Sequence, residues 1–152
     1  MKPLINMQNI LYLCILSTII PYERRSMQLY WLTDNIGVAD QISSEDVLEL
    51  SSLGVKSIIC NRPDRESGSN QPDAESIRQA SKKLGIEFAF HPVESNFQTE
   101  HDASQMAKHL CELPKPIIAY CRSGGRSTAL IGIAEQLQFI NLQELEYDSR
   151  HE

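Results

Sequence analysis

The segment IIAYCRSGGRS, residues 117–127, decides the fold because it joins a strand to a helix through a glycine-rich loop. Its four leading apolar residues, Ile117–Tyr120, predict a strand buried on both faces. The pattern that follows predicts a helix from about Arg126 to Phe139. A loop at the carboxyl end of such a strand is where open α/β sheets bind ligands. We therefore expect the functional site in this loop.

Each residue type in the loop has a physical role in binding an anion. Gly124 and Gly125 can adopt positive φ, so the backbone can curl and point N–H groups inward. The first N–H groups of the following helix lack partners within the helix, and the helix dipole adds partial positive charge. The sequence therefore predicts an anion-binding loop made of Arg122, Ser123, Gly124 and Gly125.

Cys121 lies at the start of this loop, where the same field favours its thiolate. Arg126 can hold an oxyanion through two N–H groups, and Ser127 can donate to the thiolate or cap the helix. Arg122 either shapes the field or faces solvent. An incidental cysteine in a tight turn is the alternative, but buried thiols usually have apolar neighbours. We predict Cys121, Arg126 and Ser127 as catalytic residues.

The rest of the chain alternates between strand and helix patterns. The predicted strands are Leu29–Leu32, Ile36–Ala39, Val55–Cys60 and Glu87–Val93. The predicted helices begin at Ser43–Asp46 with a stop at Gly54, and span Ala74–Leu84 and His101–Leu113; Asn61–Asp73 and Glu94–Glu100 are predicted loops. This alternation predicts an α/β fold with a central, mostly parallel sheet flanked by helices.

The chain's charge and cysteine content exclude several classes of protein. A net charge of −6 argues against a nucleic-acid partner, because binders of the phosphate backbone usually have a basic face. The four cysteines form no C-x-x-C pair, so we predict no metal site and no cofactor. Disulfide-rich secreted domains are shorter and denser in cysteine, which favours a cytoplasmic protein.

The other cysteines differ in what they predict. Cys60 ends a predicted strand, and is either a resolving thiol near Cys121 or a buried small hydrophobe. Cys111 lies on a predicted helix and is expected in the core. We draw no functional prediction from Cys14.

The N-terminal residues contain an apolar run, Ile10–Ile20, that is short for a membrane span and lacks a small-residue cleavage site after it. We favour Met27 as the true start over a weak signal or anchor and over an extra packed helix. The expected division is an N-terminal extension, residues 1–26, followed by a cysteine-enzyme domain, residues 27–152, with no membrane partner.

Two strings resemble one family. They are GVKSIICNRPDRE (residues 54–66, followed by Gln71–Asp73) and AYCRSGGRS (residues 119–127). They resemble the bacterial phosphatase-like domain of beta-lactamase-hydrolase-like proteins over about residues 27–137. The resemblance implies a dual-specificity or tyrosine-phosphatase-like fold, with the Cys60–Asp64 loop beside the Cys121 loop. It makes Cys60, Asn61, Arg62 and Asp64 candidate supporting residues. A rhodanese fold fits less well, because no Gly-His-Ile segment is present.

The chain departs from the phosphatase pattern in two ways. Four residues separate Cys121 from Arg126, as in rhodanese loops, whereas protein phosphatases normally have five. The expected acid loop has no Asp, and Glu94, Glu100 and Asp102 are poor substitutes for a general acid. Sulfur transfer needs no such acid, so our leading expectation is a sulfurtransferase.

Three functions therefore remain open. In the first, Cys121 takes sulfur from a small anionic donor as a persulfide and passes it to a thiol acceptor. In the second, Cys121 attacks a phosphate ester and forms a phosphoenzyme, with Arg126 bracing the oxygens. In the third, the chain is a non-catalytic redox or anion sensor in which Cys121 and Cys60 are oxidised.

Overall fold

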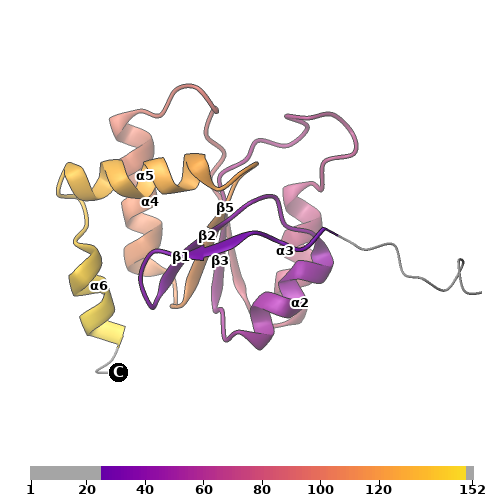
Figure 1. Ribbon diagram of the computed structural model, residues 1–152, viewed down its shortest axis with the longest axis horizontal. Coiled ribbons are helices and arrows are strands. Elements are labelled where there is room, and N and C mark those ends of the chain that lie inside the picture. The colour runs from indigo at the N-terminus through magenta and orange to yellow at the C-terminus, as the bar shows by residue number, and fades with distance from the viewer. Residues whose placement is uncertain (1–24, 150–152) are drawn as a thin grey trace, which may run out of the picture.

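The fold is built on a sheet of five strands in the order β1-β2-β5-β3-β4 (Figure 1). The computed structural model describes residues 25–149. The strands are β1 (Leu29–Trp31), β2 (Ile36–Ala39), β3 (Ser57–Cys60), β4 (Glu87–Phe90) and β5 (Ile117–Tyr120). Strands β2, β5, β3 and β4 pair in parallel, and the edge strand β1 is antiparallel to β2. The predicted central, mostly parallel sheet is confirmed.

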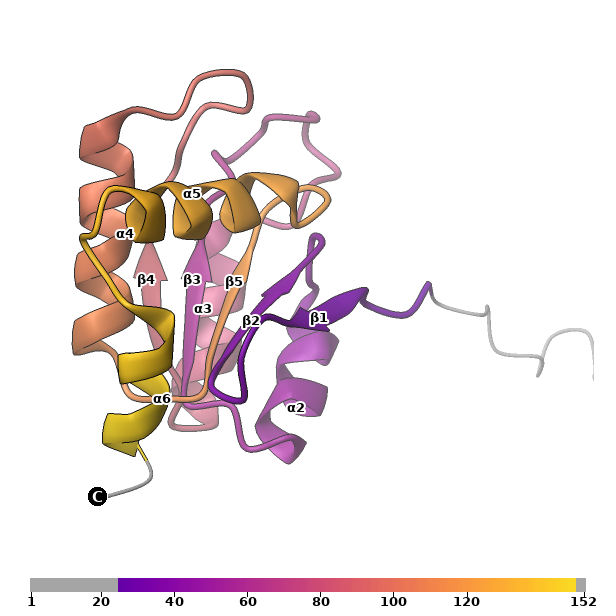
Figure 2. The ribbon, with the colours of Figure 1, turned by 60° about the vertical axis from the view of Figure 1, so that its left-hand side comes forward.

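Helices cover both faces of this sheet. They are α2 (Ser44–Ser52), α3 (Ala74–Lys83), α4 (Glu100–Glu112), α5 (Gly125–Gln136) and α6 (Leu142–Ser149). Figure 1 shows α4, α5 and α6 on one side of the sheet and α2 and α3 on the other. Figure 2 shows β3 and β4 pointing toward the edge across which α5 runs, and β5 leading through a loop into the start of that helix.

The central strand β5 contributes side chains to the hydrophobic cores on both faces of the sheet. Ile117 and Ala119 pack with α4 and α5, whereas Ile118 and Tyr120 pack with α2 and α3. Successive side chains of a strand point to opposite faces, so a strand between two helix layers must be apolar throughout. Each of these four residues is at most 1% exposed, which explains why the run IIAY contains no polar alternation.

The helix starts are set by side-chain caps. Ser43 forms a capping box with Asp46 at α2, and Thr99 forms one with Asp102 at α4. In each box the hydroxyl accepts a free N–H of the first turn and the carboxylate accepts the N–H of the capping residue. These two aspartates are therefore structural.

Three strands are shorter than the sequence pattern predicted. β1 ends at Trp31 and not at Leu32. β4 ends at Phe90 and not at Val93, because Pro92 has no N–H to continue a ladder. β3 begins at Ser57 and not at Val55, because the N–H of Val55 closes the end of α2 on Leu50 O at 3.1 Å.

The C-terminal part differs more from the prediction. Helix α5 ends at Gln136 and not at Phe139, and Gln138 has a φ of 62°, which a continuing helix does not allow. Helix α6 was not predicted. Leu142 and Leu145 pack it against the core, and Glu146 accepts the N–H of Asp34 at 2.8 Å.

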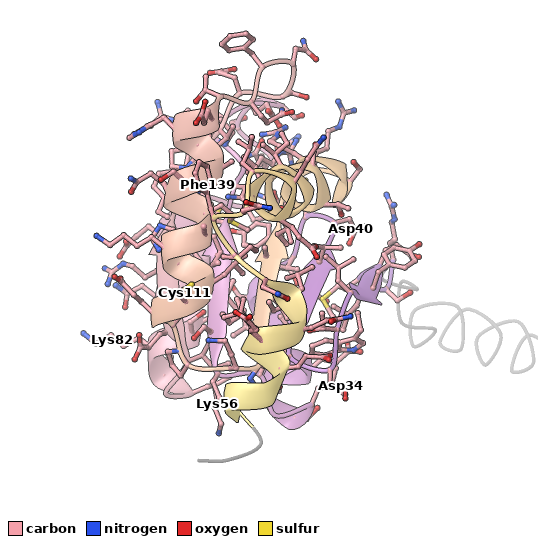
Figure 3. All side chains as sticks on the ribbon, turned by 90° about the vertical axis from the view of Figure 1, so that its left-hand side faces the viewer. Asp34, Asp40, Lys56, Lys82, Cys111 and Phe139 are labelled. Carbon is pink, nitrogen blue, oxygen red and sulfur yellow. The ribbon has the colours of Figure 1, made fainter. Side chains whose placement is uncertain are left out.

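The prediction that Cys111 lies in the core is wrong, because its side chain is exposed. Met106, Ala107 and Leu110 form the buried face of α4, and the next position turns about 100° away from that face. Figure 3 shows Cys111 on α4.

Within residues 25–149, no helix combines the length and apolarity needed to cross a bilayer. The apolar run Ile10–Ile20 and Cys14 lie outside the described residues.

We expect Ile118→Ala to lower the free energy of unfolding by about 2–5 kcal/mol, because it leaves a cavity at a fully buried site of the central strand. Urea unfolding followed by circular dichroism measures the change. Leu48→Ala is the control, since Leu48 on α2 is 63% exposed and its loss should cost less than about 0.5 kcal/mol. Equal losses in the two variants would contradict the central position of β5.

Candidate functional site

Loops from three strands are tied together at the carboxyl edge of the sheet. The N–H of Cys121 donates to O of Ala39, the last residue of β2, at 3.4 Å, and the N–H of Gln41, after β2, donates to Arg122 O at 3.2 Å. The N–H of Asn61, after β3, donates to Tyr120 O at 2.8 Å. These bonds place the Cys121 loop between the loops that follow its two neighbouring strands, as the resemblance implied for the Cys60–Asp64 segment.

Gly124 gives the loop its curl. It has a φ of 90° and precedes the first residue of α5, a conformation that only glycine adopts without strain. Its N–H points at Cys121 Sγ at 3.2 Å. Gly124, at the N-cap, has no side chain to cap this helix. Ser123 Oγ accepts the N–H of Gly125 at 3.4 Å, and the following N–H groups of the first turn can bind an anion. The Cys121 side chain is 1% exposed and lies within this curl.

The Arg126 side chain is buried, with 5% of its surface exposed. Its Nη1 donates to Val93 O at 2.8 Å and to Asn61 O at 3.3 Å, and its Nη2 donates to Glu66 Oε1 at 2.8 Å. Nε has no hydrogen-bond partner among the described residues. Nε–H and the second N–H of Nη2 form one edge of the guanidinium, which is the edge that binds an oxyanion bidentately.

Ser127 is oriented by Asn61, and both residues are fully buried. The Ser127 hydroxyl donates to Asn61 Oδ1 at 2.9 Å. The Asn61 amide is fixed in turn, because its Nδ2 donates to His91 O at 3.1 Å. The hydroxyl hydrogen of Ser127 therefore points to Asn61, whereas the sequence suggested the thiolate of Cys121 or a helix cap as its partner.

Cys60 lies at the carboxyl end of β3, paired in register with Tyr120. Its thiol is 2% exposed and donates to Arg62 O at 3.3 Å. Burial raises the pKa of the Cys60 thiol, and the charges of Asp64 and Cys121 raise it further. A thiol in this state is a poor attacking group at neutral pH, which disfavours Cys60 as a resolving thiol.

The remaining predicted residues take separate positions. Asp64 accepts the N–H of Ala74 at 2.8 Å and so supports the start of α3. Ser123 Oγ accepts the N–H of Gly125 at 3.4 Å within the loop. Arg122 is exposed and borders a pocket of about 200 Å³, beside the loop, that Asp40 and Gln41 also line.

Two of the three candidate acids, Glu100 and Asp102, belong to the first turn of α4. Burial would raise the pKa of Asp102, but its hydrogen bonds with Thr99 outweigh this and lower it, so the capping carboxylate holds no proton at neutral pH. Glu100 is the first residue of α4. Glu94 follows Val93, whose carbonyl binds Arg126. Glu94 is therefore the candidate acid that directly follows a residue in contact with Arg126.

Sequence reasoning missed Glu66. This residue ended the string that carried the family resemblance, but nothing in its local pattern indicated a role. Burial would raise the pKa of its carboxyl, but hydrogen bonds and charges from Arg62 and Arg126 outweigh burial and lower it. Glu66 is thus a carboxylate at neutral pH. No cluster of His, Cys, Asp or Glu in residues 25–149 has the arrangement of a metal site.

Comparison with known sequences gives one family. The model of the "Beta-lactamase hydrolase-like protein, phosphatase-like domain" matches residues 28–138. A beta-lactamase hydrolase-like protein of Agrobacterium fabrum is 31% identical over 111 residues, which are 73% of this chain and 26% of that protein. The chain therefore spans about a quarter of the length of the curated relatives it matches.

Solved structures agree on the fold. A protein of Neisseria meningitidis, described as a candidate phosphatase, is 30% identical with a TM-score of 0.67, over 79% of this chain and 84% of that one. A kinase-associated phosphatase, with its catalytic-site cysteine replaced by serine, is 17% identical with a TM-score of 0.61, over 85% of each chain. The expected fold of dual-specificity and tyrosine phosphatases is confirmed.

We expect Gly124→Ala to weaken the binding of tungstate, a tetrahedral oxyanion, by at least roughly 10-fold. A Cβ at this φ is strained and would lie 3.4 Å from Ala39 O, so the loop must shift and its N–H groups turn away. Isothermal titration calorimetry measures the affinity. Gly85→Ala is the matched control, because Gly85 also has positive φ but an added Cβ meets nothing within 4 Å. Unchanged affinity in Gly124→Ala would contradict the anion loop.

Proposed function

Because the chain belongs to the phosphatase-like domain family of beta-lactamase hydrolase-like proteins, we propose that it hydrolyses phosphate monoesters through Cys121. One observation carries the proposal. The buried guanidinium of Arg126 keeps its Nε edge without a partner among the described residues, beside a loop whose Gly124 N–H points at Cys121 Sγ. Such an edge and a curl of N–H groups match the oxygens of a phosphoryl group.

The first step transfers the phosphoryl group to the enzyme. The Cys121 thiolate forms an S–P bond while the P–O bond to the alcohol breaks, and Arg126 with the loop N–H groups binds the remaining oxygens. The leaving oxygen needs a proton. Glu94 is our candidate donor, because it directly follows the carbonyl of Val93 that holds Arg126.

The second step releases phosphate. A water molecule attacks phosphorus, the S–P bond breaks, and the thiolate of Cys121 is restored. The proton of that water passes to the Glu94 carboxylate, which returns the acid to its starting state. The net reaction consumes one ester and one water, and yields one alcohol and one phosphate.

Sulfur transfer is the second candidate. The comparisons favour a phosphatase over the sulfurtransferase that the sequence led us to expect, and they give no support to a persulfide. The spacing between Cys121 and Arg126 still favours it. In that reaction the Cys121 thiolate attacks the outer sulfur of thiosulfate, an S–S bond forms and sulfite leaves, and a thiol acceptor then takes the sulfur.

The other expectations about the chain stay proposals. Substrate and partners of the much longer relatives do not transfer to a quarter of their length. The net charge of −6 remains our reason to expect no nucleic-acid partner. We also retain a cytoplasmic location and a division of the chain near residue 26. The sensor alternative is weakened by the raised pKa of Cys60.

We expect wild-type protein to release phosphate from p-nitrophenyl phosphate, and Cys121→Ser to release none. Intact-protein mass spectrometry after incubation with thiosulfate should show an unchanged mass. Cys111→Ser, at an exposed cysteine on α4, is the control and should retain activity. A gain of one sulfur atom on wild type, without turnover of the aryl phosphate, would replace the phosphatase proposal with sulfur transfer.

We expect Glu94→Gln to lower kcat for an alkyl phosphate by about 10²–10⁴-fold, because an alkoxide cannot leave without a proton. The loss on p-nitrophenyl phosphate should be far smaller, since that phenolate leaves unprotonated. Steady-state kinetics on both substrates measures the ratio, with Glu100→Gln as the control. Equal losses on the two substrates would exclude Glu94 as the acid.

A further inference from the structure

Glu66 joins the two buried arginines of the site with one carboxylate. Its Oε1 accepts from Arg126 Nη2 at 2.8 Å, and its Oε2 accepts from Arg62 Nε at 2.8 Å. The side chains of Arg126 and Arg62 are 5% and 6% exposed, whereas the Glu66 side chain is 21% exposed. One carboxylate therefore serves as counter-charge to two buried cations.

The loop around Glu66 is built to turn its side chain inward. Arg65, directly before it, has a φ of 60°, and such a backbone in a non-glycine residue is uncommon outside constrained turns. Gln71 braces the turn, because its Oε1 accepts the N–H of Ser67 at 3.0 Å and its Nε2 donates to Pro63 O at 2.8 Å. The position of the carboxylate is thus set by the fold of the loop.

Arg62 is held on its other side as well. Its Nη1 donates to Gln41 Oε1 at 3.0 Å, and its Nη2 donates to Ser67 Oγ at 2.7 Å. A rigid Arg62 fixes Glu66, and Glu66 in turn fixes Nη2 of Arg126. Together with the two carbonyls on Nη1, this contact determines which edge of the Arg126 guanidinium is free.

We propose that Glu66 is a positioning residue that holds the Arg126 guanidinium with its Nε edge turned to the Cys121 loop. The inference rests on the anion loop of the proposed function. Glu66 touches neither the thiol nor the substrate, and acts through Arg126. Its removal leaves two buried guanidinium groups without a shared counter-charge, which repel each other and lose the bidentate geometry.

A simpler role makes the opposite prediction. If Glu66 only opposed the positive charge of the site, removing it would strengthen the attraction for an anion. If it positions Arg126, removing it weakens binding even though the site gains positive charge. The sign of the change in anion affinity therefore separates the two roles.

The experiment measures tungstate affinity by isothermal titration calorimetry for wild type, Glu66→Ala and Glu66→Gln. We expect Glu66→Ala to weaken binding by roughly 10-fold or more, on the scale of a hydrogen bond to a charged group. Glu66→Gln should weaken binding less than Glu66→Ala, because its amide oxygen can still accept from Arg126 whereas its amide nitrogen cannot accept from Arg62. Kinetics with p-nitrophenyl phosphate should show a larger fall in kcat than rise in KM for Glu66→Ala.

Glu75→Ala is the matched control. Glu75 binds Arg78 on the exposed face of α3 through two hydrogen bonds of 2.7 and 2.8 Å, so its loss changes net charge equally but does not reach the loop. Unchanged or tighter tungstate binding in folded Glu66→Ala would overturn the proposal. So would a wild type that binds no tungstate, since no anion edge would then be presented.

A spectroscopic measurement covers the case in which Glu66→Ala does not fold. The Arg126 Nε–H signal in ¹⁵N relaxation should report an ordered side chain in wild type and a more mobile one in Glu66→Gln. Equal order in the two would overturn the proposal. Binding and relaxation need no turnover, so a wild type that binds tungstate without releasing phosphate refutes the proposed function alone.

Discussion

The burial of the Arg126 guanidinium is the constraint on which the arrangement of the site depends. A cation with a 5% exposed side chain must be compensated by acceptors from the protein. Those acceptors come from two loops far apart in sequence: Asn61 O and Glu66 lie in the loop between β3 and α3, and Val93 O follows β4. These two loops therefore meet at the start of α5 because the Arg126 side chain needs acceptors from both.

Local patterns predicted the parts of the fold that depend on local interactions. The run IIAY indicated a central strand, and the glycines before Arg126 indicated the curl at the start of α5. Helix α6 escaped prediction because its stability comes from Leu142 and Leu145 packing on a distant core. The outward position of Cys111 follows from its place around the helix relative to the buried residues of α4. The residue type of a cysteine does not reveal that place.

The same distinction applies to the site. Cys121 and Arg126 were identifiable because they share one short loop with the glycines that shape it. Glu66 and the Asn61–Ser127 contact were not, because each joins residues more than 50 positions apart. The reaction was harder to predict than the site residues, because one fold can support different chemical reactions. The short loop favoured sulfur transfer, whereas the family and its structural neighbours favour phosphate ester hydrolysis.

The position of β5 between β2 and β3 has a consequence for how the protein is made. The middle strand of the sheet is the last of the five to leave the ribosome, so β2 and β3 have no central partner until residues 117–120 have been synthesised. Pairing across such long sequence separations forms slowly. Cys121, our proposed nucleophile, follows that strand directly, so a nascent chain carries no assembled Cys121 loop until its sheet is nearly complete.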